Sequence, residues 1–208
     1  MRVVTGEAKG RKLKAPKTTG TRPIIDRVKT ALFDILSTGV EDARFLDLFA
    51  GTGSVGIEAL SRGAASATFI EMSHSVLKLV RENLKITGLA DRAETIHADA
   101  FKFLQSYATD ANASTGNTKP REYDILYVAP PQYHEMAARA LGILDTSPLV
   151  AASGLVIIQI HPKERSGVAA VPLTRLELTD ERKYGSTLLM FYEMKEEHST
   201  NSDTGAET

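Results

Sequence analysis

The stretch "LDLFAGTGSVGIEAL", residues 46–60, decides the fold class of this chain. An apolar run typical of a strand leads into glycines at 51, 53 and 56, and a helical pattern follows. Glycines in this spacing allow a ligand to approach the backbone closely. Dinucleotide sites share the pattern, so the loop alone does not choose the cofactor. It predicts an α/β fold with a ligand at the carboxyl end of the strand.

An acidic residue beside the loop narrows the choice of ligand. Asp47 lies inside the end of the predicted strand, four residues before Gly51. A pyrophosphate bound at a helix N-terminus would be disfavoured by a nearby negative charge. A carboxylate suits a cation instead, such as the α-amino group and sulfonium of S-adenosylmethionine. The alternative is that Asp47 only caps the loop.

Two further acids follow the next two predicted strands. Glu71 ends the second strand, where a carboxylate can accept hydrogen bonds from both ribose hydroxyls, as it also does in NAD sites. Asp99 ends the third strand and is expected either to accept from an adenine amine, with the N–H of Ala100 nearby, or to cap the next helix. Acids at three consecutive strand ends favour one shared site.

Strand and helix patterns alternate along the rest of the chain. Strands are predicted at 43–50, 66–71, 93–99, 123–129 and 154–161, with helices at 21–37, 54–63, 73–88, 100–108 and 135–145. The first helix takes its apolar face from Ile25, Val28, Ala31, Leu32, Ile35 and Leu36. Ser73 and Gly88 are the expected start and stop of the 73–88 helix, and residues 109–121 are an expected loop. The alternation indicates a parallel sheet covered on both faces, and the final pair of strands in 176–194 must be antiparallel.

Charge and composition bound the function. The chain has 208 residues and a net charge of −1, yet residues 1–30 hold nine basic and two acidic residues. This asymmetry favours a basic arm that binds a polyanion. The absence of Cys excludes thiol catalysis, and the five His show no paired ligand spacing, so no metal site is expected. No apolar run reaches membrane-spanning length and no signal peptide is apparent, so a cytoplasmic protein is expected.

The segment "APPQY", residues 129–133, follows the strand predicted at 123–129. Two prolines lack N–H groups and hold the backbone rigid at the strand end. Such a loop can present carbonyl oxygens to an exocyclic amine and an aromatic ring to an extruded base. The alternative is a structural turn that places Tyr133 in the core.

Several motifs together resemble the RsmD family of small-subunit (16S) ribosomal RNA guanine-N2 methyltransferases. They are "MRVVTGEAKGRKLKAP", "TRPIIDRVKTALFDIL", "LDLFAGTGSVGIEALSRGA", "FIEMSHSVLKLVRENL", "APPQY" and "ERKYGSTLLMFYE", which lie within residues 1–194. The resemblance implies a Rossmann-like class I methyltransferase with a seven-stranded, mostly parallel sheet, a reversed last strand and a small N-terminal extension that contacts RNA.

The resemblance also assigns roles to residues. The cofactor, S-adenosylmethionine, would be held by Asp47, Phe49, Ala50, Gly51, Gly53, Gly56, Glu71, Met72, Asp99 and Ala100. The catalytic segment would be Ala129, Pro130, Pro131, Gln132 and Tyr133. The family pattern is Asp-Pro-Pro followed by Tyr or Phe, so Ala129 and Gln132 depart from it. We expect the Pro130 carbonyl and the Gln132 amide to replace the missing acceptor; the alternative is a weak or inactive relative that only binds RNA.

The expected organisation has three parts. Residues 1–22 form a basic arm or hairpin, 23–195 the methyltransferase domain and 196–208 a disordered acidic tail. Ribosomal RNA or a small-subunit particle is the expected partner of a monomeric protein. The expected RNA-binding residues are Lys9, Arg11, Lys12, Lys14, Arg22 and Arg27. A nucleotide-dependent oxidoreductase remains a further alternative, which Asp47 and the basic arm disfavour.

Overall fold

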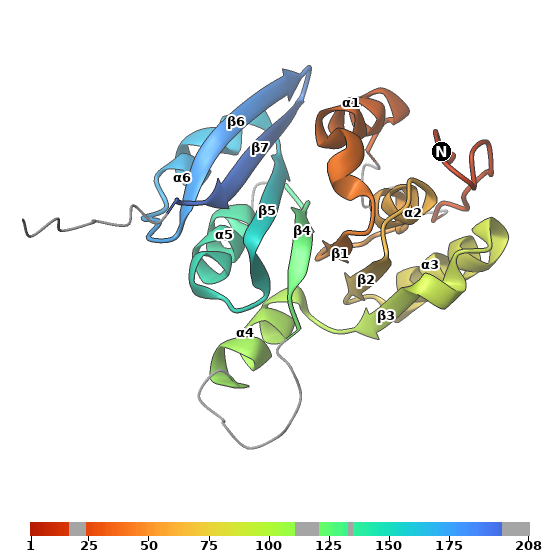
Figure 1. Ribbon diagram of the computed structural model, residues 1–208, viewed down its shortest axis with the longest axis horizontal. Coiled ribbons are helices and arrows are strands. Elements are labelled where there is room, and N and C mark those ends of the chain that lie inside the picture. The colour runs from red at the N-terminus through yellow and green to blue at the C-terminus, as the bar shows by residue number, and fades with distance from the viewer. Residues whose placement is uncertain (17–23, 111–120, 133–134, 197–208) are drawn as a thin grey trace, which may run out of the picture.

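A computed structural model describes residues 1–16, 24–110, 121–132 and 135–196. Within these residues, seven strands form one sheet in the order β3-β2-β1-β4-β5-β7-β6 (Figure 1). The strands are β1 Arg44–Asp47, β2 Ser66–Glu71, β3 Ala93–His97, β4 Tyr123–Val128, β5 Val150–Ile160, β6 Leu176–Tyr184 and β7 Thr187–Met194. The helices are α1 Asp26–Leu36, α2 Ser54–Ser61, α3 His74–Thr87, α4 Ala100–Asp110, α5 Met136–Thr146 and α6 Arg165–Ala169. Short 3₁₀ segments occupy η1 Ser37–Val40, η2 Ala90–Arg92 and η3 Pro162–Glu164.

The strand pairing confirms the predicted sheet with its reversed last strand. β1 pairs in parallel with both β2 and β4, so the chain reverses its direction of travel across the sheet between these two neighbours. Ligands bind in α/β sheets at such a switch point, outside the carboxyl ends of the strands. β7 runs antiparallel to β5 and β6 and lies between them, joined to β6 by the turn at Gly185, which has a positive φ of 61°.

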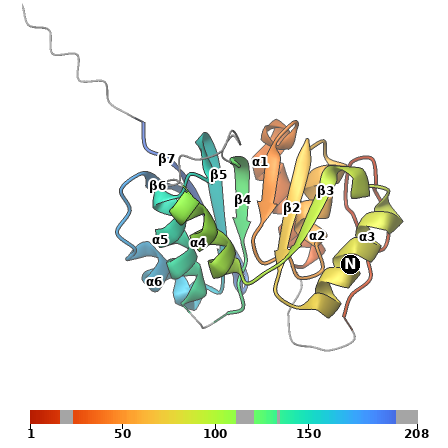
Figure 2. The ribbon, with the colours of Figure 1, turned by 90° about the horizontal axis from the view of Figure 1, so that it is seen from below.

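Helices cover both faces of the sheet. One apolar cluster joins α1, α2 and α3 to the face that includes Phe45 and Phe69. The other joins α4, α5 and α6 to the face that includes Leu46 and Ile70. Because neighbouring strand residues point to opposite faces, each central strand contributes to both clusters. Figure 2 shows α4 and α5 side by side over the second face.

The buried face of α1 differs from the predicted one. Val28, Leu32 and Leu36 are buried as expected, but Ile25 and Ile35 are 52% and 38% exposed. Between Val28 and Leu32, Lys29 is fully buried, although it was counted among the basic residues of 1–30. Polar contacts from α2 and the arm accommodate this lysine. Phe33 is buried as well, so the buried stripe is turned around the helix from the predicted one.

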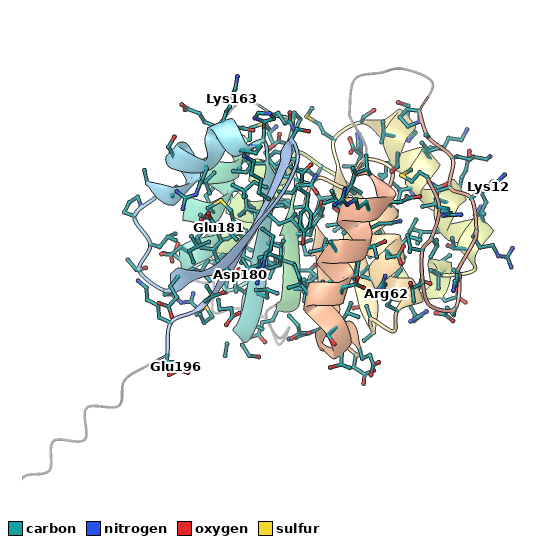
Figure 3. The ribbon with its side chains drawn as sticks, turned by 90° about the horizontal axis from the view of Figure 1, so that it is seen from above. Lys12, Arg62, Lys163, Asp180, Glu181 and Glu196 are labelled. Carbon is teal, nitrogen blue, oxygen red and sulfur yellow. The ribbon has the colours of Figure 1, made fainter. Side chains whose placement is uncertain are left out.

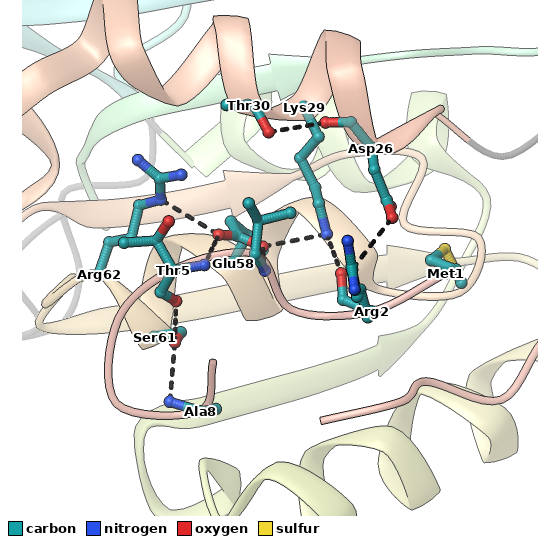
Figure 4. Close-up of polar contacts among 12 residues, drawn as sticks. Met1, Arg2, Thr5, Ala8, Asp26, Lys29, Thr30, Glu58, Ser61 and Arg62 are labelled. Atoms are coloured by element: carbon teal, nitrogen blue, oxygen red, sulfur yellow. Dashed lines mark hydrogen bonds and ion pairs between the residues drawn. The ribbon is translucent and has the colours of Figure 1, made fainter. Parts of the chain in front are cut away.

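The N-terminal arm is fastened to the domain by a buried ion pair (Figure 4). Lys29 Nζ lies 3.0 Å from Glu58 Oε2 and donates to the carbonyl of Arg2 at 2.7 Å. The Glu58 carboxylate also accepts from the backbone N–H groups of Val4 and Thr5, at 2.8 and 2.9 Å. Removing one partner of a buried pair typically costs about 3–5 kcal/mol, so this contact holds the arm in one position.

A hairpin-like arm was predicted, and its two limbs pair in the structure. Arg2 and Lys12 form an isolated antiparallel bridge, and Val3 N–H donates to the Arg11 carbonyl at 3.0 Å. The second limb reaches α3, where Asn83 accepts from Lys14 N–H at 2.8 Å and donates back to its carbonyl at 3.1 Å. The arm therefore packs on the domain over both limbs.

Several details of the prediction need correction. The sequence analysis missed η3 and α6, because this short segment, residues 162–169, buries one apolar residue, Val168, and its apolar residues do not recur at helical spacing. β5 begins at Val150, four residues before the predicted start. Ser73 does precede α3, but its side chain makes no capping bond. Residues 111–120 of the predicted loop and 197–208 of the predicted tail lie outside the described residues.

Candidate active site

The glycine loop turns the chain from β1 into α2 at the carboxyl edge of the sheet. Gly53 precedes α2 with φ of 74°, a left-handed conformation that favours glycine. Gly56 packs against the sheet, because a Cβ there would lie 2.4 Å from the ring of Phe69. These two glycines bring α2 close to β1 and β2, and the backbone N–H of Gly56 then reaches Asp47.

Asp47 is a buried carboxylate with one unused oxygen. It is 1% exposed, and its Oδ2 accepts from Gly56 N–H at 3.2 Å. Its Oδ1 accepts no hydrogen bond from any residue that the structure describes. Burial raises the pKa of Asp47 to about 7; the Gly56 N–H opposes this rise and the charge of Glu71 adds to it. A buried acceptor without a hydrogen-bond partner destabilises the folded protein. A cationic ligand that donates to this oxygen would remove that penalty and would favour the charged carboxylate, so such a ligand would fit this site.

Glu71 joins the end of β2 to the glycine loop. Its Oε2 accepts from Gly51 N–H at 3.0 Å, and its Oε1 accepts from Ser73 N–H at 2.8 Å. Each carboxylate oxygen has a second lone pair, so these bonds leave acceptor capacity for ribose hydroxyls. Met72 follows on the surface, 68% exposed. Glu71 thus shapes the loop in addition to its expected contact with a ligand.

Asp99 caps α4, which was one of the two roles considered for it. Its Oδ1 accepts from the N–H groups of Phe101 and Lys102, each at 3.0 Å. Ala100 is buried at the start of this helix. Next to Ala100, Phe101 forms an aromatic pair with Phe49, and the centres of the two rings lie 6.1 Å apart in an edge-to-face arrangement. The Arg139 guanidinium covers the Phe101 ring at 3.9 Å, which adds a cation–π contact to this apolar wall.

A cavity of about 80 Å³ joins the predicted cofactor and catalytic segments. Its lining includes Asp47, Phe49, Ala50, Gly51 and Ala129, whereas Gly53, Gly56, Glu71, Met72, Asp99 and Ala100 do not line it. Small-molecule sites usually measure about 300–1,000 Å³, so a whole cofactor would extend from this cavity across the open ends of β2 and β3.

A larger cavity of about 730 Å³ lies around Leu36, Ala43 and Asp124, at the amino ends of β1 and β4. We place the site at the smaller cavity because ligands of parallel sheets bind at the carboxyl ends of the strands.

Solvent exposure differs along the predicted catalytic segment, residues 129–133. Ala129 is half-buried at the cavity and Pro130 is buried, whereas Pro131 and Gln132 are exposed. The predicted Tyr133 lies outside the described residues. The cavity residues that the sequence analysis missed include Tyr127 and Gln159, whose side chains are joined by a 2.6 Å hydrogen bond from Tyr127 Oη to Gln159 Oε1. A polar residue within the apolar stretch "LVIIQI" was the available signal.

The predicted RNA-binding residues of the arm lie on the surface. Lys9, Arg11, Lys12 and Lys14 are exposed, as is Arg27 at the start of α1, while Arg22 lies outside the described residues. Figure 3 shows Lys12 extending outward at the end of the molecule where α3 lies. Lys14 pairs with Glu82 of α3 at 2.9 Å.

Lysines of α3 join this basic surface. The hydrogen bond from Lys14 lowers the pKa of Glu82, and the charges of Lys78 and Lys85 lower it further. Lys78 and Lys85 are exposed, so basic side chains of the arm and of α3 surround one carboxylate. The sequence analysis missed these two lysines because they are separated from the arm by more than 60 residues.

Two classes of feature are absent from the described residues. None of the helices there is both long and apolar enough to cross a membrane. In the same part of the chain, no group of three or more acidic, His or Cys side chains gathers in a way that could hold a metal ion.

Comparison with known proteins gives consistent matches. A family described as Conserved hypothetical protein 95 matches residues 1–193. "Ribosomal RNA small subunit methyltransferase D" of Escherichia coli K12 is 31% identical over 203 residues, covering 98% of this chain and 94% of that protein. "Putative rRNA methyltransferase YlbH" of Bacillus subtilis 168 is 32% identical, covering 94% of this chain and all of that protein. The structure of "Putative methyltransferase yhhF" from Escherichia coli superposes with a TM-score of 0.77 at 31% identity, covering 94% of this chain and 98% of that one.

Proposed function

We propose that this chain, which belongs to the Conserved hypothetical protein 95 family, transfers a methyl group from S-adenosylmethionine to the exocyclic N2 amine of a guanine in small-subunit ribosomal RNA. The coarser part of this function, methylation of ribosomal RNA, follows from relatives that match nearly the whole chain and carry that activity in their names. The choice of guanine N2 is the finer part of the proposal.

The unpartnered oxygen of Asp47 is the observation that carries the choice of cofactor. It lies at the carboxyl edge of the sheet in the same cavity as Ala129. S-adenosylmethionine supplies an electrophilic methyl carbon and carries two positive groups. Asp47 would accept from its cationic part, while Glu71 and Asp99 at neighbouring strand ends would hold the ribose and adenine.

Positioning is the main contribution that the catalytic segment can make. Pro130 is buried and, with Pro131, keeps the backbone after β4 rigid. The Pro130 carbonyl is then a fixed acceptor for one hydrogen of the target amine, and Tyr133 would stack on the extruded base. The segment holds no side-chain acceptor at position 129, which keeps a weak or inactive relative as the second candidate.

The basic arm and α3 would bind the phosphates of the RNA. Lys9, Arg11 and Lys12 are exposed on the arm, and Lys78 and Lys85 extend the same charge along α3. Arg22 and Arg27 are the further candidates for phosphate contacts. Because each neutralised phosphate releases counterions, RNA affinity should fall steeply with salt.

Methyl transfer to ribosomal particles tests the proposal. Small subunits from a strain lacking the gene would be incubated with the protein and radiolabelled cofactor, and modified guanines would be mapped in the RNA. N2-methylguanine at one position is the expected product. Cofactor and particle binding without any transfer, with transfer gained in Ala129→Asp, would establish the inactive relative instead.

A further inference from the structure

The structure places a polar side chain beside the position where the family pattern has its acid. β4 and β5 run parallel with Tyr127 beside Ile157 and Val128 beside Ile158. Continuing this register by one residue sets Ala129 beside Gln159, with both side chains on the same face of the sheet. Both residues line the cavity that contains Asp47. Gln159 therefore borders the space that a longer side chain at position 129 would occupy.

The Gln159 amide is held in place by its neighbour. Tyr127 Oη donates to Gln159 Oε1 at 2.6 Å. Tyr127 is 2% exposed, and burial together with the charge of Asp47 raises the pKa of its hydroxyl well above the usual value. The hydroxyl thus stays protonated and remains a donor. A carbonyl oxygen has two lone pairs, so one of them is left for a ligand in the cavity.

We propose that Gln159 is a catalytic residue that accepts a hydrogen bond from the guanine amine in place of the missing acid at Ala129. This inference rests on the proposed function and names a residue of the same site. When Oε1 holds one amine hydrogen and the Pro130 carbonyl the other, the nitrogen lone pair is aimed at the methyl carbon. The nitrogen–carbon bond forms, the carbon–sulfur bond breaks with its electrons left on sulfur, and the amine loses one proton to water, because an amide does not take it.

Gln132, the acceptor expected from the sequence, is exposed and does not line the cavity, whereas Gln159 lines the cavity and is anchored. Loss of a positioned hydrogen-bond partner raises the barrier of the step that it assists. We therefore expect Gln159→Ala to lower kcat on undermethylated particles about 5- to 150-fold. The matched control is Gln105→Ala, a change of an exposed glutamine of α4 outside the cavity, and it should keep its rate.

The experiment separates catalysis from folding and binding. The four proteins are wild type, Gln159→Ala, the control Gln105→Ala and the double variant Gln159→Ala with Ala129→Asp. Calorimetry with S-adenosylmethionine should give an affinity for Gln159→Ala close to that of wild type. Its thermal unfolding midpoint should fall, because the buried Tyr127 hydroxyl loses its acceptor, but the variant should remain folded at the assay temperature. Transfer should fall in Gln159→Ala and return when Asp stands at position 129, because the acid restores an acceptor in the same space.

Each remaining outcome counts against the inference. A full rate in Gln159→Ala overturns the role of Gln159 and leaves the proposed function intact. A loss of rate that is matched by an equal loss of cofactor affinity, or that comes from unfolding at the assay temperature, assigns Gln159 a structural role only. A wild type that is silent on every small-subunit particle refutes the proposed function, and the role of Gln159 with it.

Discussion

The pKa of Asp47 predicts how cofactor binding depends on pH. Burial raises this pKa to about 7, so the free protein holds Asp47 protonated below that pH. A cationic ligand requires the carboxylate, and the proton must therefore leave on binding. Affinity for S-adenosylmethionine should fall about tenfold for each pH unit well below 7, and roughly 25-fold between pH 7.5 and 5.5.

Calorimetry in buffers of different ionisation enthalpy measures this directly. At pH 6, close to one proton should be released for each cofactor bound. Asp47→Asn keeps an oxygen for the Gly56 N–H but removes the charge, so its affinity should be lower by about 1.5–3 kcal/mol at pH 8 and should not vary with pH. Asp91→Asn, a change of an exposed acid in η2, is the control that should behave as wild type.

The same shift has a consequence for stability, with a definite sign. The unfolded chain ionises Asp47 near its ordinary pKa of 3.8, whereas the folded protein does so at about 7. The cofactor-free protein should therefore lose stability as the pH rises from about 4 to 7, by up to about 4 kcal/mol, and Asp47→Asn should remove this loss. Cofactor affinity in the wild type that stays flat from pH 5.5 to 7.5 would refute the reasoning, as would an Asn variant that binds as tightly.

Three further predictions concern the loop, the RNA surface and the arm. Glu71→Ala should weaken S-adenosylmethionine binding about 10- to 100-fold, because a charged hydrogen-bond partner is removed; calorimetry with an unchanged affinity would contradict this. The double variant Lys78→Ala with Lys85→Ala should bind RNA more weakly, while its affinity for the cofactor stays the same. Its slope of log affinity against log salt concentration should be smaller by about 0.7–0.9 for each phosphate that is no longer neutralised. An unaltered slope would show that α3 does not contact the RNA. Lys29→Met should lower the free energy of unfolding, measured in urea, by about 3–5 kcal/mol, because the buried Glu58 carboxylate loses this partner. A change below 1 kcal/mol would show that Arg62 and the backbone N–H groups of the arm are enough to stabilise the carboxylate.

Local patterns were enough to predict the architecture of the sheet. The run around Gly51, the alternation of strands with helices and the antiparallel final pair depend on neighbouring residues, and the structure has each of them, with the shifted start of β5 and the added α6 as the main differences. The acids at consecutive strand ends were also visible, because parallel strands bring their carboxyl ends to one edge of the sheet. Their roles toward a cofactor, like those of the arm toward RNA, stay predictions, of which the experiments above test those of Asp47 and Glu71.

The composition of the cavity depended on contacts between distant parts of the chain. Helical periodicity could not show that Lys29 is buried, since its partner Glu58 lies on another helix. The sequence pointed to Gln132 as the replacement acceptor because it is near Ala129 along the chain. Strand register instead brings Gln159 beside Ala129 across 30 residues, and burial fixes Tyr127 as its donor. Register is set by the packing of whole strands against both helical layers, so it is a property of the tertiary structure and not of any segment taken alone.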